Sequence, residues 1–304
     1  MSKTGGRTDS AHRPRAHHFA HPTPEPAPTP TPDRVGEALA GMTVEQKAAQ
    51  LLVAGIEGTE PGEDAVQAIQ GYQVGGVILF GRNVESAEQL AALTNGLKEL
   101  NGDYVPLFLC VDQEGGRVDR MPPEVTDLPS ALDFGSIADP EARMDACFTL
   151  GQTLAAQCAA LRRSTGLRPQ LDIWSNPENT VIGDRAFGTD AATVTGAANE
   201  TALGILSGGV IPVAKHFPGH GDTAVDSHYG LPVVDKSLEE LEELELRPFR
   251  QGHRHYLRLR YLWGGHLHSC HHGGPHPPES DRPGQPGLLS PEVVTGLLRE
   301  GDGL

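Results

Sequence analysis

The fold and chemistry of this chain are decided by the stretch Lys215–His228, which reads K-H-F-P-G-H-G-D-T-A-V-D-S-H. Three His, two Asp and one Lys fall within it, together with Pro and Gly residues that interrupt regular structure. The apolar segment 209–214 precedes it and has the composition of a buried strand. A buried strand that opens into a loop of titratable groups is typical of catalytic residues in an α/β barrel. The alternative is a solvated loop with chance histidines.

Strands and helices alternate on either side of this stretch, which predicts parallel βαβ units. The segments with these patterns are strands at 75–80, 106–111 and 209–214 and helices at 86–100 and 142–160. Capping boxes predict two more helices, one from Thr43 through Leu52 and one that begins after Ser237. The side chains expected to point inward are Leu90, Leu93 and Leu97 in the helix at 86–100, and Leu238, Leu241 and Leu244 in the helix after Ser237.

Length and charge narrow the class of protein. At 304 residues the chain can bury one large core, so a single barrel needs no second domain. Its net charge of −16 argues against nucleic acid or an anionic membrane as a partner, and no apolar run is long enough for a membrane span. The four Cys residues show no pairing pattern, and Cys110, in an apolar strand, is expected to be a buried thiol.

Residues 1–34 have a different composition. They begin with a basic run and continue as repeats of Thr, Pro, Ala and Glu, which predicts an extended linker. No apolar signal region precedes this linker, which would be expected of a cytoplasmic chain. A lost export signal would instead place it in the cell envelope or outside the cell, and the localisation is left open.

The stretch Lys215–His228 resembles the K-H-[FI]-P-G-H-G-D-T signature of the β-N-acetylglucosaminidase branch of glycoside hydrolase family 3. Segments 111–118 (V-D-Q-E-G-G-R-V) and 175–188 (S-N-P-E-N-T-V-I-G-D-R-A-F-G) resemble two further motifs of that branch, in the same order. The resemblance implies a (β/α)8 TIM barrel over residues 35–304. It also implies a retaining hydrolase that removes terminal β-N-acetylglucosamine from glycans such as peptidoglycan or chitin fragments, without a cofactor or metal.

The resemblance assigns roles to individual residues. His228 would be the proton donor and Asp226 would orient its ring, because an imidazole can protonate the leaving oxygen and later deprotonate water near neutral pH. The alternative for this pair is a loop turn capped by the Asp. The residues that would hold hydroxyl groups of the terminal sugar are Asp112, Arg120, Arg185, Lys215 and His216. Charged side chains orient a sugar through directional hydrogen bonds.

Other polar residues in these motifs have plainer interpretations. Arg117 and Arg120 could form surface ion pairs, and Asp184 could serve only to bridge Arg185. His220 is expected to shape its loop rather than to take part in catalysis. The His-rich run His266–His272 suggests a metal site, but nothing around it predicts the scaffold that such a site needs, so no metal is expected.

Three regions depart from the family pattern. Segment 158–170 stands where an apolar strand is expected, and 251–286 has no usable period and holds seven of the 14 His residues. Codon degeneracy allows Arg163–Pro169 to be read in the next frame as V-R-L-D-F-A-P, close to the family's L-x-F-A-P, so local frameshifts are predicted. The chain also stops at Leu304, before the strand that carries the family's nucleophilic Asp. We therefore expect a barrel incomplete at its C-terminus and no turnover of an aryl β-N-acetylglucosaminide.

Two other functions are consistent with the sequence. A phosphorylase of the same branch is chemically reasonable, because a His donor does not repel an incoming phosphate. Product analysis in phosphate buffer separates it from a hydrolase, since only a phosphorylase makes sugar-1-phosphate. The third candidate is a non-catalytic sugar-binding remnant, which would bind glycans without turnover.

Overall fold

The computed structural model describes residues 33–161, 165–166, 168–223, 233–234, 236–256 and 271–272. By compactness the chain divides into two units, residues 1–41 and 42–304. The first unit contains the described helix α1 (Arg34–Gly41), and nearly all of the predicted linker lies outside the described residues. All other described elements belong to the second unit.

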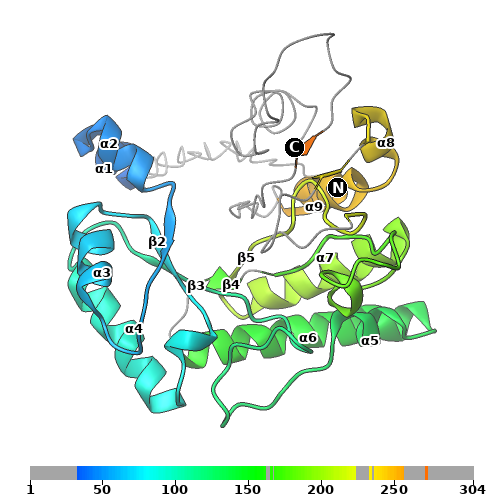
Figure 1. Ribbon diagram of the computed structural model, residues 1–304, viewed down its shortest axis with the longest axis horizontal. Coiled ribbons are helices and arrows are strands. Elements are labelled where there is room, and N and C mark those ends of the chain that lie inside the picture. Colours follow the sequence, from blue (N-terminus) through cyan, green and yellow to red (C-terminus); the bar gives the residue numbers. More distant parts are fainter. Residues whose placement is uncertain are drawn as a thin grey trace, which may run out of the picture. The chain divides into compact units, whose positions relative to one another are not determined.

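The second unit is built on a parallel sheet, shown in Figure 1. Its strands run in the order β1 (Val53–Gly55), β2 (Gly76–Leu79), β3 (Phe108–Val111), β4 (Thr165–Gly166) and β5 (Ile211–Pro212). The backbone register places Val77 opposite Leu109, and Thr165 between Cys110 and Ile211. A separate two-stranded parallel sheet joins β6 (Val233–Val234) to β7 (His271–His272). Because the five strands are parallel, their carboxyl ends lie along one edge of the main sheet.

Helices precede, connect or follow these strands. They are α2 (Val44–Ala49), α3 (Glu63–Val66), α4 (Ala87–Asn101), α5 (Ala131–Gly135), α6 (Pro140–Ala160), α7 (Ala191–Ser207), α8 (Leu238–Glu243) and α9 (Leu246–Tyr256), with short turns η1 (Gln67–Gly71), η2 (Gly81–Asn83) and η3 (Gly183–Arg185). Helix α4 joins β2 to β3, α6 precedes β4, and α7 joins β4 to β5. Helices α6 and α7 pack side by side (Figure 1). The α/β class with a parallel sheet is confirmed, and closure into a barrel of eight strands stays a prediction.

The two faces of the sheet are packed by alternate residues of each strand. Val77 and Leu79 of β2 pack in one core cluster with the predicted inward face of α4, Leu90, Leu93 and Leu97. The residue between them, Ile78, instead packs with Cys110 and Val213. The helix prediction for 86–100 and the buried Cys110 are therefore confirmed.

Some helix predictions need correction. Thr43 and Ser237 do form capping boxes, but the helix after Thr43 ends at Ala49 and not at Leu52, because the chain must extend into β1 at Val53. Leu241 is buried as expected, whereas Leu238 is 54% exposed because it lies in the first turn of α8, ahead of the part that packs on the core.

Helix α9 also corrects the sequence analysis. Residues 251–256, at the start of the segment for which no period was recognised, continue this helix to Tyr256. Leu246 and Phe249 are fully buried at its beginning, and the helix contacts α7. Packing of this first part accounts for a helix that the His-rich sequence alone does not indicate. None of the helices in the described part of the chain is both long and apolar enough to cross a membrane.

Candidate active site

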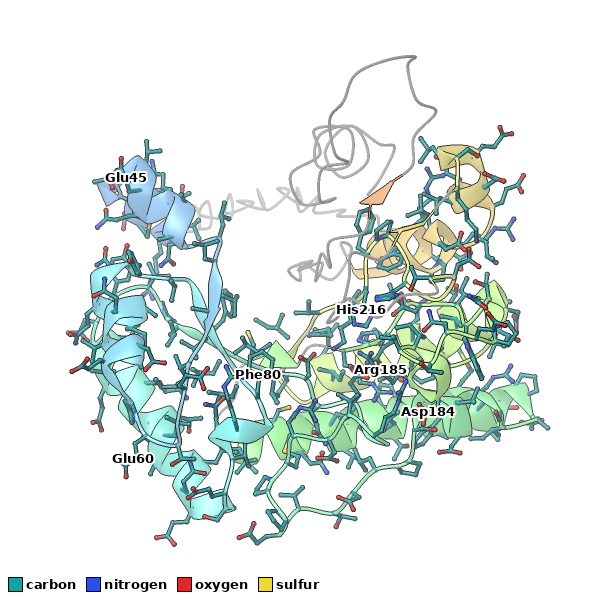
Figure 2. The ribbon with its side chains drawn as sticks, in the orientation of Figure 1. Glu45, Glu60, Phe80, Asp184, Arg185 and His216 are labelled. Atoms are coloured by element: carbon teal, nitrogen blue, oxygen red, sulfur yellow. The ribbon has the colours of Figure 1, made fainter. Side chains whose placement is uncertain are left out.

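Charged side chains from three segments meet at the carboxyl edge of the main sheet. Asp112 follows β3 directly, and Lys215 and His216 follow β5. Arg185 is contributed by η3, between the chain segment after β4 and helix α7. Figure 2 shows Arg185 and His216 close to each other in this region, and Arg185 Nη2 lies 3.2 Å from His216 Nε2. The strand ends therefore hold Asp112, Lys215 and His216 as expected.

Four charged side chains at this edge form what we call the ion network: Asp112, Glu114, Arg185 and Lys215. The Nζ of Lys215 contacts Asp112 Oδ1 and lies 2.7 Å from Glu114 Oε1. Glu114 in turn accepts two N–H groups of Arg185, with Nε 2.8 Å from Oε2 and Nη2 2.9 Å from Oε1. The guanidinium and the carboxylate thus form a two-point pair, which fixes their relative orientation.

Glu114 and Arg185 of the ion network keep their charges in the neutral pH range. Burial alone would raise the pKa of Glu114, but the charge of Lys215 and the hydrogen bonds and charge of Arg185 hold that pKa well below its usual range. Burial alone would lower the pKa of Arg185, yet the hydrogen bonds and charge of Glu114 raise it. The site therefore combines full positive and negative charges in a region with little solvent.

His216 joins the ion network as a neutral ring. Its Nδ1 lies 2.6 Å from Asp172 Oδ2, and its Nε2 lies 3.2 Å from Arg185 Nη2. Since a guanidinium can only donate, Nε2 accepts, and the ring proton sits on Nδ1 and is donated to Asp172. Burial lowers the pKa of His216 to about 4, although Asp172 opposes the shift. The ring is therefore uncharged at pH 7.

This buried ring gives a pH prediction. Between pH 6.5 and 4 the unfolded chain binds a proton on His216 while the folded chain does not, because burial lowers the folded pKa to about 4. Over that window the wild type should lose about 3 kcal/mol of unfolding free energy through this ring. In His216→Asn the amide can still donate to Asp172 but does not titrate, so this variant should not show the loss of unfolding free energy that comes from the ring. Urea unfolding at several pH values checks it, and identical pH profiles would contradict it.

Asp172 also fixes the loop that follows His216. Its Oδ1 accepts the backbone N–H of His220 at 2.7 Å, and the ring of His220 contacts Thr223 Oγ1 at 2.5 Å. The carbonyl of His220 accepts from Asn179 Nδ2 at 2.7 Å. A Cβ at Gly221 would lie 1.7 Å from a backbone oxygen, so this close approach requires glycine. The contacts of His220 are those of a loop-shaping residue.

The remaining arginines of these loops have other partners. Arg117 pairs with Asp184 at 2.8 Å, and both side chains are nearly half exposed. Arg117 therefore forms a surface ion pair, and Asp184 serves it rather than bridging Arg185, which pairs with Glu114. Arg120 donates its backbone N–H to Gln113 at 2.8 Å and a guanidinium N–H to the carbonyl of Asp119 at 3.1 Å.

The predicted donor pair, Asp226 and His228, lies outside the described residues. The chain on either side of them is described. Asp222 before them forms an ion pair of 3.1 Å with Lys236 after them, and Lys236 also contacts Glu245 at 2.5 Å. The pair between Asp222 and Lys236 connects the two ends of the segment that contains both residues.

Glu114 and Asp172 are two site residues to which the sequence analysis gave no role. Glu114 lies inside a recognised motif shortly after the predicted strand at 106–111, and Asp172 lies after the irregular segment 158–170. A signal for Glu114 was available: Lys215 and Arg185, if buried, need carboxylate partners, because unpaired buried charges are costly. Among the described residues no group of three or more His, Cys, Asp or Glu side chains is arranged to hold a metal ion. Most of the run His266–His272 lies outside those residues.

Comparisons with known proteins identify relatives of the chain by sequence. The chain is 37% identical over 198 residues to the β-hexosaminidase of Methylobacillus flagellatus. The aligned region covers 64% of the chain and 56% of that protein. It is 42% identical over 175 residues to the β-hexosaminidase of Methylococcus capsulatus, covering 58% of the chain and 51% of the relative. The chain thus spans about half the length of these two curated relatives.

Solved structures are similar as well. A glycoside hydrolase family 3 β-N-acetylglucosaminidase from Paenibacillus sp. superposes with a TM-score of 0.73 at 36% identity, covering 86% of the chain and 47% of that protein. NagZ from Neisseria gonorrhoeae superposes with a TM-score of 0.70 at 32% identity, covering 83% and 71%. The model of the glycosyl hydrolase family 3 N terminal domain matches residues 43–303. The chain therefore belongs to glycoside hydrolase family 3.

Proposed function

We propose that this chain forms the catalytic domain of a retaining glycoside hydrolase that removes terminal β-N-acetylglucosamine from glycans such as peptidoglycan or chitin fragments. The observation that carries the proposal is the ion network at the carboxyl edge of the sheet, where barrel enzymes have their active sites. Sugar hydroxyl groups both donate and accept hydrogen bonds, and the ion network offers charged donors and acceptors side by side. The names of the related proteins, β-hexosaminidase and β-N-acetylglucosaminidase, support the substrate class.

The proposed fold is a (β/α)8 TIM barrel over residues 35–304, preceded by the linker at 1–34. The five-stranded parallel sheet would supply its first five strands. The structural neighbours of the family, with TM-scores of 0.73 and 0.70, support this extension. In such a barrel the residues that follow β3 and β5 face a common site at the carboxyl ends of the strands.

Within this site we assign the hydroxyl groups of the terminal sugar to five residues: Asp112, Arg120, Arg185, Lys215 and His216. His228 would donate a proton to the glycosidic oxygen and later take one from water, and Asp226 would orient its ring. Retaining hydrolysis also needs a nucleophilic carboxylate, and this role is assigned to none of the described residues.

A phosphorylase of the same branch is not favoured, because the curated relatives are named as hexosaminidases. A sugar-binding protein without turnover differs from the proposal in activity alone. A glycan-binding assay beside an activity assay separates these two, since only the hydrolase releases free sugar.

Calorimetric titration of the full chain tests the proposal without relying on turnover. We expect N-acetylglucosamine to bind and glucose to bind more weakly. Lys215→Met should weaken binding about tenfold or more, because it removes a charged donor. Lys47→Met, on the exposed surface of α2, is the control and should not change binding. Equal binding of both sugars, or of neither, would count against the proposed function.

A further inference from the structure

Glu114 is one of the most enclosed groups of the ion network. Its side chain is 2% exposed, compared with 14% for Arg185 and 18% for Asp112. Oε1 is shared by Lys215 Nζ at 2.7 Å and Arg185 Nη2 at 2.9 Å, and Oε2 accepts Arg185 Nε at 2.8 Å. Both oxygens are therefore occupied by two cations of the protein itself.

The backbone that carries Glu114 is held by a tight turn. Its N–H donates to the carbonyl of Val118 at 2.9 Å. Gly115 and Gly116 have φ angles of 77° and 56°, in the left-handed region that favours glycine. A Cβ at Gly115 would lie 2.6 Å from the carbonyl oxygen of Pro129. The side chain of Glu114 thus extends from a closely packed base.

We propose that Glu114 is a positioning residue that sets the separation and orientation of Lys215 and Arg185. The inference rests on the proposed function, which gives these two cations their role in binding the sugar. The shared oxygen Oε1 holds two like charges together that would otherwise repel each other. The two-point contact fixes the plane of the guanidinium, whose Nη2 also donates to His216 at 3.2 Å. Glu114 acts on the sugar only through these partners.

The test is Glu114→Gln in the full chain, with N-acetylglucosamine as the probe in calorimetric titration. The amide has no charge and turns an N–H donor toward the two cations, so they should lose their common position. We expect the Kd to rise about 10- to 100-fold while the number of binding sites per chain stays the same. A purely structural role would instead reduce the number of sites, because some chains would not fold, and leave the Kd unchanged.

Two further variants sharpen the test. Glu114→Asp keeps the charge but is one methylene shorter, so it cannot reach both cations and should also raise the Kd even if Glu114→Gln fails to fold. Asp184→Asn is the matched control, because Asp184 pairs with Arg117 across the same two loops without being part of the ion network, and it should change the Kd less than twofold. Combined with Lys215→Met, Glu114→Gln should weaken binding by less than the product of the two single effects.

The possible failures are distinguishable. Absence of sugar binding by the unsubstituted chain would overturn the proposed function and this inference with it. Sugar binding that both Glu114→Gln and Glu114→Asp retain at the wild-type Kd would overturn this inference alone. A double variant in which the effects of Glu114→Gln and Lys215→Met on the Kd multiply fully would also overturn this inference.

Discussion

Arg168→Met should raise the free energy of unfolding by about 3 kcal/mol. The guanidinium of Arg168 is fully buried, and none of its three nitrogen atoms finds a hydrogen-bond partner among the described residues. The face of the Phe187 ring, 5.5 Å from its Cζ, offers partial compensation. Burial lowers the pKa of Arg168 to about 10, which reflects the cost of the enclosed charge. Methionine fills a similar space without a charge.

Urea unfolding of both proteins at pH 7 measures this gain. Its pH dependence follows from the lowered pKa. Below about pH 10 Arg168 is charged in the folded and in the unfolded chain, so the difference between the proteins should be constant from pH 6 to 8. Above about pH 10 the folded wild type loses the proton first, and the difference should shrink. A variant that is less stable than the wild type at pH 7 would contradict the prediction.

Arg185→Met should have the opposite effect and lower the free energy of unfolding by about 3 to 5 kcal/mol. Arg185 is also largely buried, but its guanidinium makes two contacts with Glu114, at 2.8 and 2.9 Å, and one with His216. Removing it leaves the enclosed carboxylate of Glu114 with fewer donors. Under the proposed function the variant should also bind N-acetylglucosamine more weakly. Urea unfolding and calorimetric titration measure the two effects separately.

Arg117→Met is the matched control for both substitutions. Its pair with Asp184 is nearly half exposed, and exposed ion pairs contribute at most about 1 kcal/mol. The same change at three arginines should therefore stabilise at Arg168, destabilise strongly at Arg185 and change little at Arg117. If the losses at Arg185 and Arg117 were equal, the buried pair with Glu114 would not have the importance given to it here.

The elements with strong periodic patterns were predictable from the sequence. Helix α4 and strands β2 and β3 lie close to where the leucine spacing and the apolar runs place them. The end of α2 and the exposure of Leu238 could not be predicted from the sequence, because they depend on how far the neighbouring core extends. Helix α9 was missed because its later part is polar in sequence, although Leu246 and Phe249 at its beginning are buried.

The irregular segment 158–170 shows why a sheet can form where the side chains do not fit. The strand β4 pairs with β3 and β5 through backbone groups, which nearly every residue type supplies. The side chains that follow are Arg168 and Gln170, whose polar atoms are buried without hydrogen-bond partners among the described residues. The frameshift stays a prediction, and its alternative reading would place alanine at position 168.

For the candidate site, the sequence motifs identified the cations and one of the carboxylates. Asp112, Lys215 and Arg185 could be recognised because each belongs to one of the three sequence motifs that resemble the family. Glu114 and Asp172 contribute through contacts with residues distant in the sequence, 71 positions away for Arg185 and 44 for His216. Such pairings depend on which loops meet above the sheet, and no local pattern specifies this.

Two ion pairs join the loops that meet in this site, and they differ in their response to dissolved ions. Arg117 of the first loop pairs with Asp184 of the second, and Arg185 of the second pairs with Glu114 of the first. At physiological ionic strength charges in water are screened over about 8 Å, whereas enclosed charges are screened far less. Concentrated salt should therefore weaken the half-exposed ion pair of Arg117 with Asp184 and leave the enclosed pair of Arg185 with Glu114 in place. The centre of the site should therefore keep its geometry at salt concentrations that weaken the ion pair between Arg117 and Asp184.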